Sequence, residues 1–259
     1  MVKVYLKYLK LHLKSVMQYK LSFILGFISQ FFVFFASYFV IISLFEKFGS
    51  IKGFTVYEIL FTFAVVNIGF SLNEVFARGV DNFDHFIKAG KYDQLLLKPV
   101  NIFLQVLGSD INFLKLSKLL QSIVILIIAL VNLDIDWSVF KVLIILNMIA
   151  GAFCVFLGVF ILNAAYCFYT VEGLEVRNVL SYGGREMAQY PVSVFKKEFA
   201  TFFTYVIPFA FINYYPLLYF TGRESNILLV FSPLIIILFV IPCYYIFNIS
   251  SRKYLSTGS

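Results

Sequence analysis

The chain has 259 residues, of which 61% are hydrophobic and 14% are charged, and its formal net charge is +7. A soluble domain is about half apolar and about a quarter charged, so this composition excludes a water-soluble protein built around one core. Basic charge can indicate nucleic-acid binding. In so apolar a chain, an uneven distribution of Lys and Arg across a membrane explains the charge better, and we expect no nucleic-acid partner.

Residues 2–17 predict an amphipathic helix. Four lysines recur at helical spacing on one face, and apolar residues share the other: Lys3, Lys7, Lys10 and Lys14 against Val2, Leu6, Leu9, Leu13 and Met17. The lysines suit lipid phosphates and the apolar side chains suit acyl chains. The pattern favours an interfacial helix on the cytosolic membrane surface over an ordinary basic flank.

Long apolar stretches follow at residues 21–45, 57–77, 115–133, 146–170 and 227–249. As a helix, the uncharged stretch 21–45 would be ~37 Å long, against about 30 Å for the hydrocarbon core of a bilayer. It is also too long for the apolar part of a signal peptide, so we expect a retained anchor. The second stretch carries Asn67, Asn73 and Glu74, and such groups usually face a protein interior or a water-filled path. Glu74 could alternatively lie at the inner interface.

The distribution of Lys and Arg predicts the orientation. Basic residues are concentrated in residues 1–20 and 78–118, while the outer loops carry few. The positive-inside rule then places both termini in the cytosol of a multi-pass protein with six crossings. Residues 171–226 leave two alternatives for the fifth crossing, either 173–192 or 198–220. Hydropathy and the positive-inside rule favour the second, which holds Lys196 and Lys197 inside.

A polar-rich stretch at residues 78–114 follows the second crossing. Phe83 and Ile87 lie four residues apart, so they share one face of a short helix that Gly90 would end. We expect this helix to be cytosolic and to present an exposed apolar ridge to a partner surface. The alternative is that the segment packs on its own membrane helices.

Motifs for chemistry are missing from the sequence. A phosphate-binding loop needs G-x-x-x-x-G-K-[ST], whereas Gly90–Lys91 is followed by Tyr92. Cys154, Cys167 and Cys243 fall inside apolar stretches without paired spacing, which is typical of small buried residues. We therefore expect no catalytic, cofactor-binding or metal site and no enzymatic activity in this chain.

Three local motifs carry a resemblance to a known family. IKAGKYDQLLLKPV (87–100) resembles G-x-[LY]-D-x-x-L-L-[RK]-P-[VL]. QYPVSVF (189–195) resembles R-Y-P-x-x-[IV]-[YF], with Gln189 where Arg is common. VIPFAFINYYPLLYFTGR (206–223) resembles L-P-x-A-F-x-x-Y-x-P-x-x-x-L-x-G. With the amphipathic N-terminal helix and six crossings, the chain resembles an ABC-2 type permease, the membrane subunit of a bacterial ATP-binding-cassette exporter.

The resemblance implies an all-α integral membrane fold, with residues 1–259 as one transmembrane domain in the bacterial plasma (inner) membrane. It implies a dimer of separate ATPase subunits that holds ATP and Mg²⁺, and a second permease copy or paralogue; membrane lipids are the remaining partners. Segment 79–98 would couple to the ATPase through six residues: Phe83, Ile87, Gly90, Asp93, Leu96 and Pro99.

The resemblance also favours a fifth crossing at 173–192, followed by a re-entrant outer hairpin at 193–222. Six residues would then lie at the transport path or the subunit interface, with the first two forming a pair: Arg185, Glu186, Tyr190, Pro191, Pro208 and Pro216. Two other functions remain open, a non-transport immunity or scaffold subunit and an ion-coupled secondary carrier. The carrier would require buried acids and broken helices in matched halves, and we find no such internal symmetry.

Overall fold

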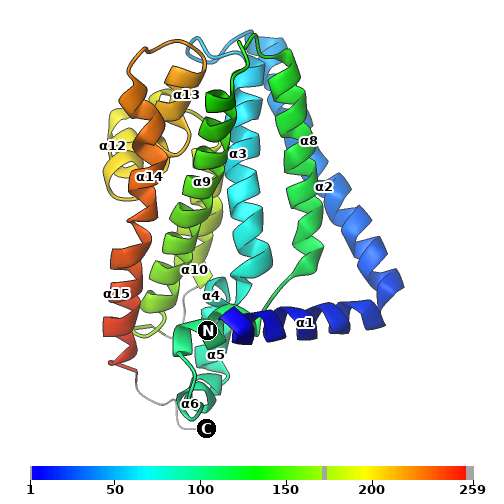
Figure 1. Cartoon of the computed structure of the whole chain (residues 1–259), viewed down its shortest axis with the longest axis vertical. Helices are drawn as coiled ribbons and strands as arrows, with labels where there is room; N and C mark the ends of the chain where they lie inside the picture. Colours follow the sequence, from blue (N-terminus) through cyan, green and yellow to red (C-terminus); the bar gives the residue numbers. More distant parts are fainter. Residues whose placement is uncertain (1, 171–173, 255–259) are drawn as a thin grey trace.

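The computed structural model describes residues 2–170 and 174–254, and within them the fold is all-α. The β-type pairing in this part of the chain is limited to an isolated bridge between Ile51 and Phe54. Helix α1 (Val2–Gln18) lies across one end of a tall helical bundle (Figure 1). The last residues of the bundle's final helix reach this same end, as the expectation of six passes requires.

Four long helices match the predicted crossings. They are α2 (Lys20–Phe48), α3 (Val56–Phe76), α8 (Leu116–Asn132) and α9 (Val139–Tyr166). The final stretch is broken into η5 (Ile227–Phe231), α14 (Ser232–Ile237) and α15 (Val240–Ser251). Among the described residues, five helical stretches are long and apolar enough to cross a membrane, or up to six with a bent pair. The protein is therefore an all-α integral membrane protein.

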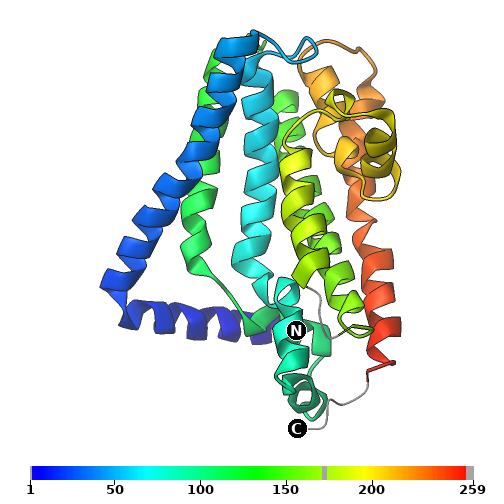
Figure 2. The same cartoon turned by 180° about the vertical axis from the view of Figure 1, so that it is seen from behind.

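Helix α3 forms the centre of the bundle. It is apolar around its whole circumference, which is typical of a helix buried on all sides, and 89% of its apolar window is covered by the rest of the chain. Helices α8 and α9 pack on either side of it. In contrast, only 6% of the corresponding window in α2 is covered, and Figures 1 and 2 show α2 leaning away from the bundle.

The cytosolic segment of the sequence prediction forms four short helices at the end of the bundle where α1 lies. They are α4 (Arg78–Asp81), α5 (Phe83–Lys88), α6 (Lys91–Leu96) and α7 (Ile102–Ser109). Gly90 separates α5 from α6 with a φ of 62°, a left-handed conformation that favours glycine. The prediction that the first helix ends at Gly90 is confirmed.

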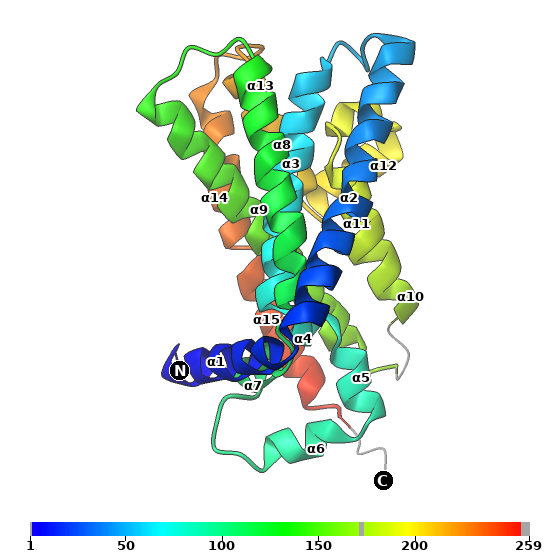
Figure 3. The ribbon, with the colours of Figure 1, turned by 90° about the vertical axis from the view of Figure 1, so that its right-hand side faces the viewer.

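One continuous helical run rises along α3 and α9 and leads to the hairpin region (Figure 2). It comprises α10 (Leu174–Arg177), the π-helix η2 (Asn178–Gly183) and α11 (Gly184–Ala188). The segments η3 (Val192–Val194), α12 (Lys197–Tyr205), η4 (Phe209–Phe211) and α13 (Tyr214–Phe220) follow. The chain bends by 76° between α12 and the η4–α13 segment, and both parts lie in the half of the molecule away from α1 (Figures 1 and 3). The α10–α11 run corresponds to the first sequence alternative for the fifth crossing, and the bent α12–α13 segment corresponds to the second. Residues 171–173 lie outside the described part.

Candidate functional site

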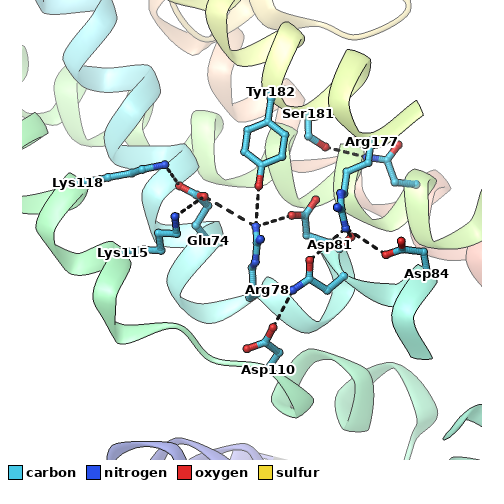
Figure 4. A network of polar contacts seen from close by, with 12 residues as sticks. Glu74, Arg78, Asp81, Asp84, Asp110, Lys115, Lys118, Arg177, Ser181 and Tyr182 are labelled. Carbon is cyan, nitrogen blue, oxygen red and sulfur yellow. Dashed lines mark hydrogen bonds and ion pairs between the residues drawn. The ribbon is translucent and has the colours of Figure 1, made fainter. Parts of the chain in front are cut away.

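A cluster of buried charges lies where α3 meets the short helices (Figure 4). Glu74, near the end of α3, is fully buried. Lys118 Nζ is 2.8 Å from its Oε2, and Lys115 Nζ is 3.6 Å from its Oε1. The two lysines are three residues apart at the start of α8, so one helical face directs both toward the carboxylate. Of the two sequence alternatives for Glu74, the structure supports a position inside the protein.

Arg78 extends this cluster to the helical run that follows α9. Its Nη1 is 2.8 Å from Asp81 Oδ2 and also donates to Tyr182 Oη at 2.7 Å. Tyr182 belongs to the π-helix η2, a rare conformation that occurs often at functional sites. Arg78 therefore joins the end of α3 and α4 to η2 directly.

Arg177, at the end of α10, forms a second centre. It is buried, and its Nη1 donates to Asp84 Oδ1, Asn82 Oδ1 and the Asp81 carbonyl oxygen at 3.1 to 3.2 Å. Asn82 in turn donates to Asp110 Oδ2 at 2.8 Å, beyond the end of α7. The short helices α4 and α5 are thereby fixed to α10.

We call this cluster the ionic junction. Its charges balance, because four cationic groups face four carboxyl groups: Arg78, Lys115, Lys118 and Arg177 with Glu74, Asp81, Asp84 and Asp110. Burial raises the pKa of Asp81 from 3.8 to about 6, in spite of the attraction of Arg78. Removing one member of a buried pair leaves an uncompensated charge, which costs about 3–5 kcal/mol. The junction therefore holds five segments together: α3, α4, α5, α8 and the α10–η2 run.

The expectation that Phe83 and Ile87 form an exposed ridge is wrong. Both are buried, because aromatic side chains from the ends of α9 and α15 cover them. The Phe83 ring centroid lies 5.1 Å from that of Phe168 and 5.8 Å from that of Phe247. The segment thus packs on its own membrane helices, which was the alternative interpretation.

The exposed apolar residues of this region lie further along the chain. Leu96 and Leu97 have 51% and 85% of their surface exposed. Pro99 and three nearby lysines are also exposed: Lys88, Lys91 and Lys98. Asp93 is half-buried. Of the six predicted coupling residues, Leu96 and Pro99 are therefore the ones a partner could contact directly. The sequence analysis therefore predicted the wrong exposed face for this segment, and the coupling role of the segment stays a prediction.

The residues predicted at the path or interface face mostly inward. Arg185 pairs with Glu186, as expected, and its guanidinium lies 5.1 Å from the Phe70 ring of α3. Pro191, Pro208 and Pro216 are buried and Tyr190 is half-buried. They are therefore packed within this chain's own hairpin region, and Glu186 is the one of the six that is exposed.

The far end of α3 carries an ion pair that the sequence analysis did not single out. Arg223, after α13, contacts Glu58 through Nε and Nη2 at 3.0 and 2.8 Å. Its guanidinium also lies 4.4 Å from the centre of the Phe54 ring. Glu58 is buried, so the pair fixes the end of the hairpin region to α3. The sequence signal that could have revealed this pair was Glu58, an acidic residue near the end of a predicted crossing.

A family model described as "ABC-2 family transporter protein" matches residues 31–258. No curated protein and no solved structure matches the chain.

Proposed function

Because the chain belongs to the ABC-2 transporter family, we propose that it is the permease subunit of an ATP-binding-cassette exporter, driven by a separate ATPase. The ionic junction is the observation that supports this most strongly. It connects short helices outside the bundle to three of the long segments within it, which is what a subunit moved from outside requires. ATP and Mg²⁺ would be held by the ATPase dimer, and this chain would do no chemistry of its own.

The junction offers a route for motion between the two regions. A force on α5 and α6 acts on Asp84 and Asp81, whose partners are Arg177 and Arg78. These side chains cannot separate one at a time at low cost, because each would leave a buried charge without its partner. Displacement of α4 and α5 would therefore move α3, α8 and α10–η2 as a unit.

Leu96, Leu97 and Pro99 form the surface that we assign to the ATPase, with the surrounding lysines suited to acidic residues on it. Phe83 and Ile87 are buried and do not belong to this surface. The Phe83 ring packs against Phe168 and Phe247, which would keep α5 rigid when the ATPase moves it. Gly90 permits the turn that directs α6 outward, and Asp93 lies in the first turn of α6.

The membrane placement follows from the same proposal. The α1 end would lie in the cytosol of a bacterium, and residues 193–222 would enter and leave the outer leaflet as a re-entrant hairpin. The α10–α11 run would provide the fifth crossing and bring Arg185 into the bundle. A second copy or a paralogue would complete the transport path.

Affinity purification of the tagged chain from native membranes tests the proposal. We expect an ATPase with a phosphate-binding loop to be recovered at a fixed ratio to the chain. The double variant Leu96→Asp with Leu97→Asp should lose it while remaining monodisperse. Ile227→Asp with Leu228→Asp, a pair at the opposite end with 47% and 70% of its surface exposed, should keep it.

Two results would contradict the proposal. In one, the Leu96 and Leu97 double variant retains the ATPase and full transport. In the other, the purified chain alone in liposomes moves a solute uphill without nucleotide, as an ion-coupled carrier would. Recovery of a non-ATPase partner without any transport would instead indicate the immunity or scaffold function.

A further inference from the structure

An apolar groove of about 770 Å³ runs between the continuous α10–η2–α11 run and α12. Val179, Leu180 and Met187 line one wall, and Phe199, Phe202 and Phe203 line the other. Its volume falls within the range of about 300–1,000 Å³ that is typical of small-molecule sites. The groove is separate from the ionic junction, whose residues do not line it.

One wall of the groove is formed by a π-helical segment that ends in a glycine. Residues Asn178–Gly183 are π-helical, and Gly183 lies on the floor of the groove. A Cβ atom at position 183 would meet the Asn178 carbonyl oxygen at 3.5 Å, which is ordinary van der Waals contact. The position thus tolerates a side chain, and the open volume depends on its absence.

Charged residues mark one end of the groove. Lys196, Lys197 and Glu198 are consecutive and exposed at the start of α12, and Glu198 lines the groove. Exposed charges are strongly disfavoured within the hydrocarbon of a membrane, so this end belongs at the level of the lipid head groups. The aromatic wall begins at the next residue, Phe199, so the groove leads from head-group level into the apolar layer.

We propose that this groove binds a zwitterionic phospholipid, with an acyl chain between the two apolar walls. Lys196 and Lys197 complement the phosphate, and the Glu198 carboxylate complements an ammonium group such as that of phosphatidylethanolamine. Of the three charged residues, Glu198 is the one that lines the groove, and its carboxylate attracts a head group that carries an ammonium and repels one that carries only negative charge. The site goes beyond the proposed transport function, because it requires neither an ATPase nor a transported solute.

Native mass spectrometry of the delipidated full chain tests the site, with phosphatidylethanolamine or phosphatidylglycerol added back. We expect one phosphatidylethanolamine to bind at a lower concentration than phosphatidylglycerol. Gly183→Leu fills the floor and should weaken this binding at least ~10-fold, because tenfold corresponds to about 1.4 kcal/mol and filling a groove removes more than one methylene contact. Leu143→Phe adds bulk on exposed α9 surface outside the groove and should leave binding unchanged.

Two more variants protect the test against misfolding and address the head group. Val179→Trp narrows the groove from a side chain that is already 68% exposed, so it should fold normally and also weaken binding. Glu198→Gln should reduce the preference for phosphatidylethanolamine over phosphatidylglycerol toward equality. The proposal is wrong if both groove variants bind phosphatidylethanolamine like the wild type. If these variants also dissociate an oligomer, the groove is instead a contact with another copy of the chain.

Discussion

Glu74 shows how much of the junction depends on one side chain. It is the acidic partner of both Lys115 and Lys118, and these lysines lie within a helix long and apolar enough to span the membrane. Its negative charge therefore offsets two buried cations at once.

Replacing Glu74 with Gln should destabilise the protein strongly. We expect a loss of about 3–5 kcal/mol, the usual cost of removing one partner from a buried ion pair, measured as a lower thermal unfolding midpoint in detergent. Adding Lys118→Met should recover part of the loss, because one uncompensated cation is then removed. Glu46→Gln, an exposed acid at the end of α2, serves as the matched control. Equal midpoints for Glu74→Gln and the control would contradict this account of the junction.

Asp81 should give the protein a specific pH dependence. Its pKa is about 6 in the folded chain against 3.8 for an unperturbed Asp, with burial as the largest cause. The folded state therefore holds this proton more tightly than the unfolded state. The resulting stability is complete below about pH 4 and is lost as the pH rises through about 6, a change of ~3 kcal/mol.

The comparison with Asp81→Asn isolates this effect, because every other titrating group is common to both proteins. We expect the unfolding midpoint of the wild type to fall relative to that of the variant between pH 4 and pH 7.5. Asn keeps an acceptor oxygen for Arg78, so the variant should fold. Midpoints that stay parallel across this range would show that Asp81 does not titrate there.

At the scale of elements, α1 packs one side on the protein and leaves apolar residues and lysines exposed on the others. Tyr5 and Tyr8 contact the protein, since Tyr5 Oη donates to the Phe76 carbonyl oxygen at 2.7 Å and the Tyr8 ring lies against Gly108. Leu6, Leu13 and Met17 are exposed, and the lysines lie beside them. The sequence pattern predicted the helix and its lysine face, but it could not predict the protein-facing side. That side depends on where α3 ends and α7 lies.

Tyr5→Phe should loosen α1 without unfolding the bundle. The hydrogen bond is worth about 1 kcal/mol, which corresponds to an increase of about fivefold in local opening. Burial also raises the pKa of Tyr5 to about 12, so the hydroxyl remains a donor at any practical pH. The rate of tryptic cleavage at Lys3, Lys7, Lys10 and Lys14 measures the opening. Tyr19→Phe, where Tyr19 is 71% exposed, should leave that rate unchanged.

At the scale of the whole molecule, the sequence predicted the long helices well and the contacts among them poorly. Apolar stretches of bilayer length mapped closely onto α2, α3 and α8, because length and hydropathy are local properties. Helix α9 begins at Val139, before the predicted start at residue 146. The burial of Phe83 depends on Phe168 and Phe247, which are 85 and 164 residues away. The Arg177–Asp84 and Arg223–Glu58 pairs are equally distant along the chain. No local pattern contains these pairings, so the junction could not be predicted.

In the proposed placement, the fifth crossing is a segment that local hydropathy does not favour. Residues 174–188 contain Arg177, Arg185 and Glu186 and read as poorly apolar. The two arginines have partners within the fold: Arg177 binds Asp84, and Arg185 pairs with Glu186 and lies over the Phe70 ring. In the proposed placement these arginines would cross the membrane paired within the protein, whereas Glu175 and Glu186 are exposed. Residues 198–220, although more apolar, are bent by 76°.

A cysteine at position 196 distinguishes the two membrane placements. Lys196 is exposed, and in the hairpin arrangement it lies at the outer surface. In a chain whose native cysteines are replaced by Ala, Lys196→Cys should react with a membrane-impermeant maleimide added to whole cells. Glu46→Cys, predicted to be outside, and Lys98→Cys, predicted to be inside, give the reference signals. Labelling of position 196 only after the membrane is opened would place it with Lys98, and residues 198–220 would then be the fifth crossing.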